Sequence, residues 1–259
     1  MQGGIKMSET HTTKPQAKIM LITGGSRGIG AATAYKAADQ GFDVAISYTS
    51  SRETAEEIAR NIRAKGKNAL AVPCDVRDED SIKNFFDKTE QELGPITAVF
   101  ANAGITGPVA LLKDLRTEDL KDVMDTNVMG AFITVREGMK RMSSHGGGTI
   151  VVMSSRAAQL GSGGEFIHYA ASKGAMDSLT IGLAREAASD NIRVNAVAPG
   201  LIDTQIHNVG DGKRLERLLP GVPMGRVGGP DEVADVVLWL SGPQSSYVNG
   251  AIIPISGGR

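Results

Sequence analysis

The chain has 259 residues, of which 41% are hydrophobic and only 4% aromatic, so it can build the core of one α/β domain from small aliphatic side chains. Its 28 basic and 29 acidic residues nearly cancel, which argues against a nucleic-acid or membrane-surface partner. The single cysteine, Cys74, excludes an intramolecular disulfide and a cysteine-rich zinc site, and no apolar run approaches the roughly 20 residues that span a bilayer. We therefore expect a cytoplasmic protein.

Residues 17–259 are predicted to form a single domain, because no Pro/Gly/Ser-rich linker divides them. The first 16 residues, MQGGIKMSETHTTKPQ, lack the apolar core of a signal peptide, and we expect a disordered leader there. Residues 201–229 are long, rich in Gly and Pro and mixed in polarity. This composition is typical of a mobile lid or substrate loop rather than of a second domain.

Short β-rich runs alternate with longer helix-like runs along this domain. Most of the β-rich runs are continuously apolar, which is the pattern of strands buried on both faces of a parallel sheet. Strands are predicted at residues 18–23, 43–48, 69–74, 97–102, 149–154, 193–198 and 251–256. Repeated strand–helix–strand units with right-handed crossovers predict a single-domain Rossmann fold, a doubly wound parallel sheet of about seven strands with helices on both faces.

The segment RETAEEIARNIRAKG, residues 52–66, illustrates the helical pattern. Its apolar residues share one helical face: Ala55, Ile58, Ala59 and Ile62. Lys65 and Gly66 then supply the positive charge and the glycine expected at a helix C-terminus.

A glycine-rich loop, TGGSRGIG at residues 23–30, follows the first predicted strand and opens a helix. Gly24 allows a sharp turn, while Gly28 and Gly30 let the backbone and the helix approach a pyrophosphate at the helix N-terminus. The loop lacks the G-K-[ST] ending of a phosphate-binding NTPase loop, which argues against ATP or GTP. The loop therefore predicts a dinucleotide site, with a simple tight turn as the alternative.

The end of the second strand indicates which dinucleotide is preferred. An NAD site usually places an acidic residue there to hold the ribose 2′-hydroxyl, but the sequence reads SYTSSR at 47–52, with no carboxylate before Glu53. Arg27 lies in the glycine loop and Arg52 follows the strand, and guanidinium groups attract a 2′-phosphate. NADP is therefore favoured over NAD, with two solvated surface arginines as the alternative.

Seven motifs occur in one order along the chain: TGGSRGIG, CDV (74–76), NAG (102–104), Asn127, SS (154–155), YAASK (169–173) and PG (199–200). With this set the chain resembles the short-chain dehydrogenase/reductase family from Lys18 to Gly258, and the C-terminal YVNGAIIPISGG resembles the family's last strand. Ser256 departs from the pattern, since an acidic residue is common at that place.

The resemblance implies a set of cofactor-binding residues. Asp75 would contact the adenine ring, Pro199 and Gly200 would pass beneath the nicotinamide, and Thr204 would bond its amide or the phosphates. The full set is Gly24, Ser26, Arg27, Gly28, Ile29, Gly30, Asp75, Val76, Asn102, Ala103, Gly104, Tyr169, Lys173, Pro199, Gly200 and Thr204.

The resemblance also implies a catalytic group of Asn127, Ser155, Tyr169 and Lys173, with Asn127 holding a water in a proton relay. Ser154 is the alternative to Ser155, which the alignment of the strand end favours. The interval from Ser155 to Tyr169 is one residue longer than the commonest family spacing, with the extra residue in GSGGEFIHY. This loop shapes the substrate pocket, so the insertion weakens any inference about the substrate.

Tyr169 and Lys173 are four residues apart, so on a helix both point into one cleft. Hydride transfer to a carbonyl creates an alkoxide, and a tyrosine hydroxyl can protonate it. A free phenol has a pKa near 10, which should fall by about 3 units for exchange near neutrality. At an effective dielectric of 20, an ammonium about 4 Å away stabilises the phenolate by about 4 kcal/mol, which matches the required change in pKa. Ser155 would stabilise the developing oxyanion, and Lys173 would also hold the nicotinamide ribose.

These residues predict an NADP-dependent oxidoreductase acting on a ketone, an aldehyde or the corresponding alcohol. A 3-oxoacyl carrier-protein reductase would need a basic patch at the mouth, for which Lys213, Arg214, Arg217 and Arg226 are candidates. A sugar or polyol dehydrogenase would need polar pocket residues such as Gln159, Glu165 or His168. His168 and His207 are candidates for substrate contacts, with simple exposure on the surface as an equal alternative.

A non-catalytic dinucleotide sensor is the alternative from another class, and the intact catalytic group argues against it. No residue cluster has metal-ligand spacing, so no metal is expected. The resemblance implies a homotetramer or homodimer assembled through the long helices that hold Asn127 and Tyr169. The segment VADVVLWLSG and the last strand are candidates for a second interface.

Overall fold

The computed structural model describes residues 18–205 and 214–259, so the predicted leader and part of the predicted lid lie outside it. The strands are β1 (Ile19–Ile22), β2 (Asp43–Tyr48), β3 (Ala69–Pro73), β4 (Ala98–Ala101), β5 (Gly148–Met153), β6 (Ile192–Pro199) and β7 (Ile252–Ile255). Each overlaps one predicted strand: β2 has the predicted bounds, and no end of the other strands differs by more than one residue.

Helices separate consecutive strands along most of the chain. The α-helices are α1 (Gly28–Asp39), α2 (Arg52–Ala64), α3 (Glu79–Leu93), α4 (Thr117–Met124), α5 (Gly130–Ser144), α6 (Ala157–Leu160), α7 (Ile167–Glu186), α8 (Arg214–Leu218) and α9 (Pro230–Ser241). Short 3-10 segments are η1 (Leu112–Asp114), η3 (Ala187–Asp190), η5 (Leu219–Gly221) and η6 (Pro243–Ser245), and η2 (Asp125–Met129) is a π-helical turn between α4 and α5. Helix α2 ends as predicted, since Gly66 adopts a φ of 82°.

The strands form one parallel sheet in the order β3-β2-β1-β4-β5-β6-β7. The chain winds outward from β1 to β3 and then returns to β4, beside β1. At such a switch point the two crossovers leave on opposite faces, which opens a crevice at the carboxyl ends of the strands. The predicted doubly wound Rossmann fold is confirmed.

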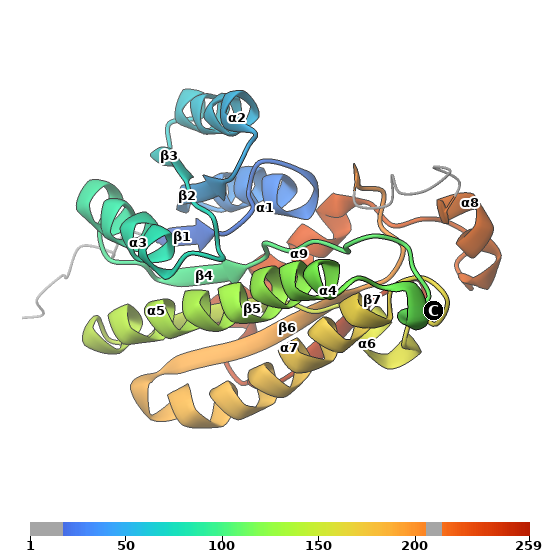
Figure 1. Cartoon of the computed structure of the whole chain (residues 1–259). Helices are drawn as coiled ribbons and strands as arrows, with labels where there is room; N and C mark the ends of the chain where they lie inside the picture. Colours follow the sequence, from blue (N-terminus) through green and yellow to red (C-terminus); the bar gives the residue numbers. More distant parts are fainter. Residues whose placement is uncertain (1–17, 206–213) are drawn as a thin grey trace, which may run out of the picture.

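Helices cover both faces of the sheet (Figure 1). Helices α1, α2 and α9 pack on one face, where Ala34, Ile58 and Val237 contact inward-facing side chains of the strands. Helices α3, α5 and α7 pack on the other, through residues such as Phe85 and Met176. Because both faces are covered, the strands are apolar at nearly every position, which explains why their sequences do not alternate.

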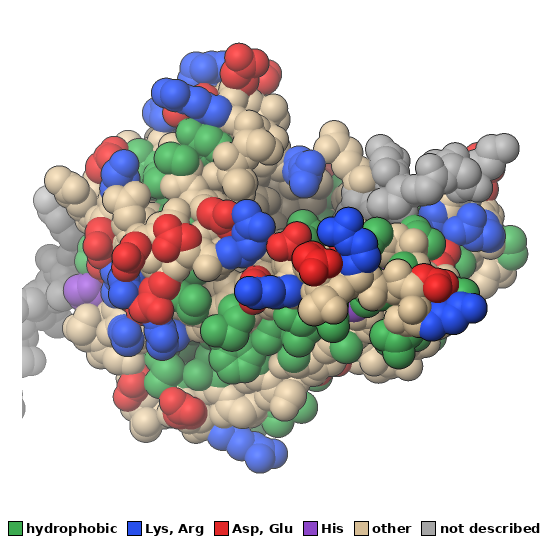
Figure 2. Space-filling model, in the orientation of Figure 1, with side chains coloured by type: hydrophobic (Ala, Val, Ile, Leu, Met, Phe, Trp, Pro, Cys, Tyr) green, Lys and Arg blue, Asp and Glu red, His purple; other side chains and the backbone are tan. Residues whose placement is uncertain are grey.

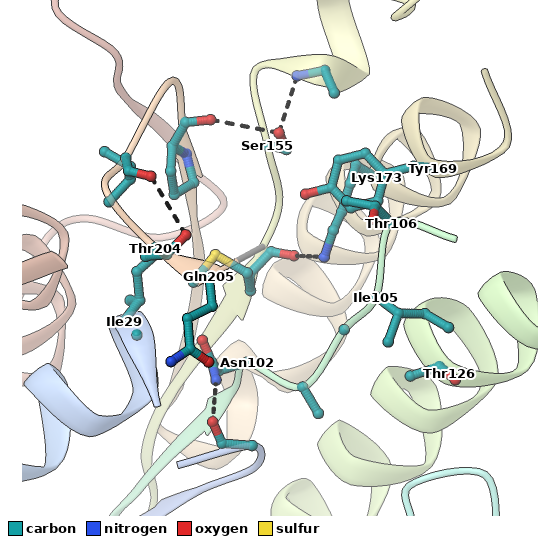
Figure 3. A pocket seen from close by; sticks show the side chains of 18 of the residues that line it. Ile29, Asn102, Ile105, Thr106, Thr126, Ser155, Tyr169, Lys173, Thr204 and Gln205 are labelled. Atoms are coloured by element: carbon teal, nitrogen blue, oxygen red, sulfur yellow. Dashed lines mark hydrogen bonds between the residues drawn. The ribbon is translucent and has the colours of Figure 1, made fainter. Parts of the chain in front are cut away.

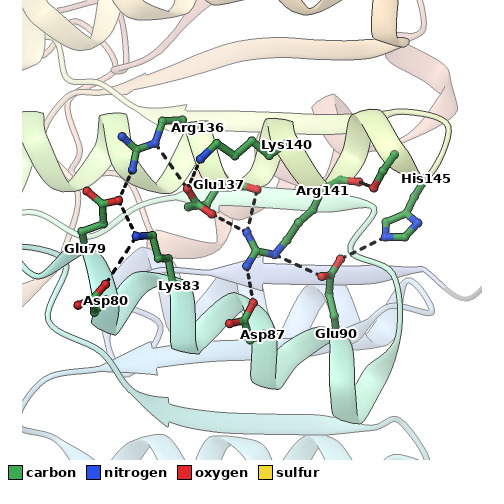
Figure 4. Close-up of polar contacts among 11 residues, drawn as sticks. Glu79, Asp80, Lys83, Asp87, Glu90, Arg136, Glu137, Lys140, Arg141 and His145 are labelled. Carbon is green, nitrogen blue, oxygen red and sulfur yellow. Dashed lines mark hydrogen bonds and ion pairs between the residues drawn. The ribbon is translucent and has the colours of Figure 1, made fainter.

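Ion pairs tie α3 to α5 on the second face (Figure 4). The buried Glu137 accepts hydrogen bonds from Lys140 at 2.9 Å and Arg141 at 2.7 Å. Arg141 also lies 3.2 Å from a carboxylate oxygen of Glu90, and its guanidinium stands 5.0 Å from the centre of the Phe86 ring. This network braces the helix that leads out of the π-helical turn at Asn127.

Candidate active site

A cavity of about 1070 Å³ opens at the carboxyl ends of β1, β2, β4, β5 and β6. All the predicted site residues line it except Gly30 and Asn127. One half is bounded by the glycine loop and the end of β2, and the other by α6, α7 and α8. A cavity at the switch point of such a sheet is the place where a dinucleotide binds.

The glycine loop turns as the sequence predicts. Gly24 and Gly28 adopt φ values of 66° and 53°, which favour glycine. Gly30 serves a purpose different from the one expected: a Cβ there would lie 2.4 Å from the carbonyl oxygen of Gly24 and 2.7 Å from Nδ2 of Asn102. Gly30 therefore permits close packing of α1 on the loop, and it lies outside the cavity wall.

Hydrogen bonds between strand ends fix the floor of the cavity beneath this loop. Asn102 donates from Nδ2 to the carbonyl oxygens of Thr23 and Gly24 at 2.9 and 3.0 Å (Figure 3). The hydroxyl of Thr23 accepts from the backbone N–H of Asn102 and of Ala103, and Ser47 accepts from the N–H of Gly24 at 3.0 Å. These bonds hold β1, β2 and β4 in register at the point where the loop begins.

The far end of the cavity carries positive charge. Arg27 lines the wall and is exposed, whereas Arg52, the first residue of α2, does not line it. Asp75 is held by Arg77 through a bidentate contact of 2.7 and 3.0 Å, which lowers the pKa of the Asp75 carboxyl. Burial raises the pKa of the neighbouring Cys74 thiol to about 11, so this cysteine is unreactive at neutral pH.

Ser155 and Tyr169 lie close together on the wall of the other half of the cavity (Figure 3). Ser155 Oγ accepts from the N–H of Ala157 at 3.1 Å and donates to the carbonyl oxygen of Pro199 at 3.5 Å, and the hydroxyl is near enough to Tyr169 to lower the pKa of the phenol. Ser154 is buried and bonds Asp177 on α7 instead. The orientation of the two hydroxyls thus favours Ser155 over Ser154, as the strand alignment does.

Lys173 and Asn127 lie behind Tyr169. Lys173 is 3% exposed, and its Nζ donates to the carbonyl oxygen of Met153 at 2.7 Å and stands 5.6 Å from the centre of the Tyr169 ring. The Asn127 side chain bonds both the N–H and the carbonyl of Ile105 at 2.8 Å. Asn127 therefore fixes the loop after β4, and the expected relay water stays a prediction.

The electrostatics differ from what the sequence predicts for Tyr169. Burial raises the pKa of its hydroxyl, while the nearby Ser155 hydroxyl and the charge of Arg214 act in the opposite direction. Burial also lowers the pKa of Lys173 to about 8, against the charge of Asp177. Desolvation of both groups depends on how deeply they are buried, which the four-residue spacing alone does not reveal.

The mouth of the cavity is built from the loop before α7 and from α8. Glu165 accepts from Arg214 at 3.1 Å and from Arg217 at 2.8 Å, and the Arg214 guanidinium stands 5.1 Å from the centre of the Phe166 ring. Arg226, the third arginine of the predicted basic patch, pairs with Glu232 at 2.7 Å. These arginines therefore have intramolecular carboxylate partners, and Lys213 lies outside the described residues.

Of the polar residues proposed for a sugar pocket, only Glu165 lines the cavity at this mouth. Gln159 points away from the cavity and donates to Asp177 at 2.8 Å. His168 is 3% exposed, packs against Phe166 and sits beneath Gly107, so it is not a surface residue. His207 lies outside the described residues.

Comparison with known proteins identifies the family. Residues 24–259 match a family model described as enoyl-(acyl carrier protein) reductase. The chain is 42% identical over 245 residues to an uncharacterized oxidoreductase, YgfF, of Escherichia coli, with 93% of this chain and 99% of the relative covered. It is 34% identical over 241 residues to the 3-oxoacyl-[acyl-carrier-protein] reductase FabG of Staphylococcus aureus, covering 93% and 97%.

The chain belongs to the short-chain dehydrogenase/reductase family. It is an oxidoreductase of that family, as the motifs predict.

Three solved structures show how far the likeness to this family extends. A short-chain type dehydrogenase/reductase from Mycobacterium marinum has a TM-score of 0.89 at 35% identity, with 93% of this chain and 94% of that chain covered. A blue fluorescent protein from a metagenomic library, in complex with NADPH, has a TM-score of 0.87 at 32% identity, with 93% of this chain and 97% of that chain covered. An NAD⁺-bound xylitol dehydrogenase has a TM-score of 0.87 at 33% identity, with 95% of this chain and 100% of that chain covered.

Several residues of this short-chain dehydrogenase/reductase site were missed from sequence. Thr23 and Ser47, which position the glycine loop, were not predicted; Glu165 and Arg214 were each named as candidates, but their pairing was not predicted. Asp177 lies one helical turn beyond Lys173, and this four-residue interval was the one signal in the sequence that could have found it. Across residues 18–205 and 214–259, no cluster of His, Cys, Asp or Glu is placed to hold a metal, and no helix is long and apolar enough to cross a membrane.

Proposed function

We propose that the protein transfers a hydride between NADP(H) and a carbonyl or secondary alcohol substrate, with Tyr169 as general acid and base. The observation that carries this proposal is the convergence of Ser155 and Tyr169 on one wall of the cavity, with Lys173 behind them and the glycine loop opposite. A substrate oxygen held between the two hydroxyls would stand in the same cavity as a dinucleotide that enters along the loop.

The residues present fit a dinucleotide phosphate. Side chains at Gly24 or Gly28 would be strained by positive φ, which keeps bare backbone at the N-terminus of α1, where a pyrophosphate is stabilised. Arg27 lines the end of the cavity near residues 49–51, which carry hydroxyls and no carboxylate. NADPH is bound in one similar structure and NAD⁺ in another, so NAD is the runner-up.

In this reaction NADPH supplies the hydride when it is bound. Ser155 donates a hydrogen bond to the substrate oxygen and stabilises the charge that develops on it. Tyr169 delivers the proton to that oxygen in reduction and removes it in oxidation. Lys173 would hold the nicotinamide ribose, and its ammonium would favour the deprotonated phenol.

The substrate class is proposed at the level of ketones, aldehydes and their alcohols. A 3-oxoacyl group on a carrier is the next candidate, because of the similarity to FabG, although Glu165 and Glu232 neutralise much of the arginine cluster at the mouth. A polyol is the third, because a xylitol dehydrogenase is similar in structure and Glu165 lines the cavity.

The first experiment is a titration of the purified protein with NADPH and NADH, followed by a panel of simple ketones, acyl substrates and polyols. We expect NADPH to bind more tightly and at least one carbonyl to be reduced. Tyr169→Phe should abolish turnover while leaving NADPH affinity within a few-fold. Tight binding without turnover on every class would favour a dinucleotide sensor, and a preference for NADH would refute the assignment of NADP.

We also propose a homotetramer or homodimer. Hydrophobic side chains gather over α5 and α7 in Figure 2, and Met129, Phe132 and Ile181 are 54%, 43% and 41% exposed. On α9, Trp239 is 41% exposed, which suits a second interface. Light scattering of the wild type and of Phe132→Glu would test the first interface, because the variant should dissociate there.

We propose that the protein is located in the cytoplasm, because the reducing conditions there suit a chain whose single cysteine is buried. Cell fractionation would check this location.

A further inference from the structure

Three successive residues at the end of β5 each engage a different turn of α7. The carbonyl of Met153 accepts from Lys173 at 2.7 Å, and the Ser155 hydroxyl lies near the phenol of Tyr169. Ser154, between them, donates to a carboxylate oxygen of Asp177. The partners on α7 are spaced by four residues, so they form one row along the helix. The first two members of this row belong to the proposed reaction, whereas the third has no role in it.

Asp177 is more firmly held than an ordinary helix-surface carboxylate. It is half-buried, its Oδ1 accepts from the fully buried Ser154, and its Oδ2 accepts from Gln159 Nε2 at 2.8 Å. Gln159 in turn accepts from Arg156 Nη1 at 3.0 Å. The carboxylate is therefore fixed from two sides, on β5 and on α6, and α6 begins the loop that leads to Glu165 at the mouth of the cavity.

The position of Asp177 matters because Lys173 is buried. An ammonium that is 3% exposed and bonded to a neutral carbonyl loses most of its hydration, and burial lowers the pKa of Lys173 to about 8. Asp177 is the charge that opposes this effect. The ammonium in turn acts on the carboxylate: burial raises the pKa of Asp177, while Ser154, Gln159 and Lys173 lower it.

We propose that Asp177 is a positioning residue that keeps Lys173 protonated and joins the substrate loop at 156–165 to the lysine. The inference rests on the proposed function only for the role given to Lys173 in catalysis. Bonds from Ser154 and Gln159 fix this carboxylate one helical turn along α7 from Lys173, and Asp177 does not line the cavity. The charge is thus supplied without occupying the space that ribose and substrate need.

The other groups around the pair are accounted for. Tyr169 is the titratable neighbour of Lys173 on α7 itself, and Arg214 of α8 acts on Tyr169 from the mouth. From η2, Asn127 presents a neutral amide near Lys173, and β5 presents backbone and hydroxyl groups. From α6, the charged neighbour of Asp177 is Arg156, which reaches it through Gln159.

The direct test measures the ionisation of Lys173 in the full chain, without cofactor, by NMR of ¹³Cε-labelled lysine. The Lys173 signal is assigned by its loss in Lys173→Arg. In the wild type we expect a midpoint near the value of about 8 given above. Asp177→Asn should lower it by about one pH unit, as expected for the loss of a nearby opposite charge. Asp177→Glu keeps the negative charge, so its Lys173 midpoint should stay close to that of the wild type.

Glu186→Gln is the matched control, because it makes the same acid-to-amide change at the exposed end of α7, away from Lys173. Its Lys173 midpoint should equal that of the wild type. An unchanged midpoint in Asp177→Asn would overturn the proposal, even if that variant were less stable. Should the Asn variant not fold, Asp177→Ser removes the same charge with a smaller side chain and gives the same comparison.

Kinetics separate this inference from the proposed function. In the active enzyme, the alkaline limb of kcat/KM for NADPH-linked reduction should move to lower pH in Asp177→Asn, with kcat near pH 6 little changed. A lower midpoint by NMR without any NADPH-linked turnover in the wild type would support the inference and refute the function. If the wild type and Asp177→Asn both turn over with the same alkaline limb and the same Lys173 midpoint, the proposed function is supported and the inference about Asp177 is refuted.

Discussion

Replacing Arg27 with Ala should reduce the affinity for NADPH much more than the affinity for NADH. Arg27 lines the cavity, and residues 49–51, which line the same cavity, offer only hydroxyl side chains. A pair of unit charges 4 Å apart is worth about 1 kcal/mol at the dielectric of water and about 4 kcal/mol at an effective dielectric of 20. Because Arg27 is exposed, the lower figure applies to each charge. A 2′-phosphate carries nearly two negative charges, so the loss should be about 2 kcal/mol, or about thirty-fold in Kd.

The assay is a fluorescence titration with NADPH and with NADH at low and at physiological salt. Arg52→Ala is the matched control, since Arg52 is equally exposed but does not line the cavity. We expect that control to change neither affinity by more than about two-fold, and the Arg27 effect to shrink with salt because the charge is screened. Equal losses for NADPH and NADH, or a larger loss in the Arg52 variant, would refute the argument for a 2′-phosphate site.

Three further predictions concern packing, charge and the mouth of the cavity. Gly30→Ala forces a Cβ to 2.4 Å from the Gly24 oxygen, so it should cost about 1–3 kcal/mol in unfolding free energy and weaken NADPH binding; unchanged values would refute the packing role. Burial raises the pKa of Glu137, but its Lys and Arg partners outweigh this and lower it overall, so its stabilisation is present above the unfolded value of 4.5 and is lost as pH falls through the folded pKa. Glu137→Gln should therefore lower Tm by about 5 °C at pH 7 and by much less near pH 3, and an equal difference at both pH values would contradict this. Glu165→Gln removes the ion pairs that hold Arg214, so KM should rise about ten-fold with kcat less affected; an unchanged KM would show that the pairs do not shape the substrate site.

The sequence alone determined the fold, and it was enough to predict the residues that we propose as the chemical centre. Strands buried on both faces must be continuously apolar, so seven such runs between amphipathic segments left little choice of architecture. Gly24 could be assigned because a sharp turn after a strand requires a left-handed residue. Tyr169 and Lys173 could be paired because a four-residue interval on a helix fixes two side chains on one face. In each case the controlling interaction acts within a few residues.

Only the tertiary structure decided the environment of that centre. The sequence predicts a lowered pKa for Tyr169, but the depth at which it and Lys173 are buried depends on how α7 packs against β5 and η2. Ser154, at the end of β5, binds the Asp177 carboxylate across 23 residues of sequence, and Glu165 binds Arg214 across 49 residues. Desolvation and charge pairing between distant segments have no local signature, because they arise when the chain closes on itself.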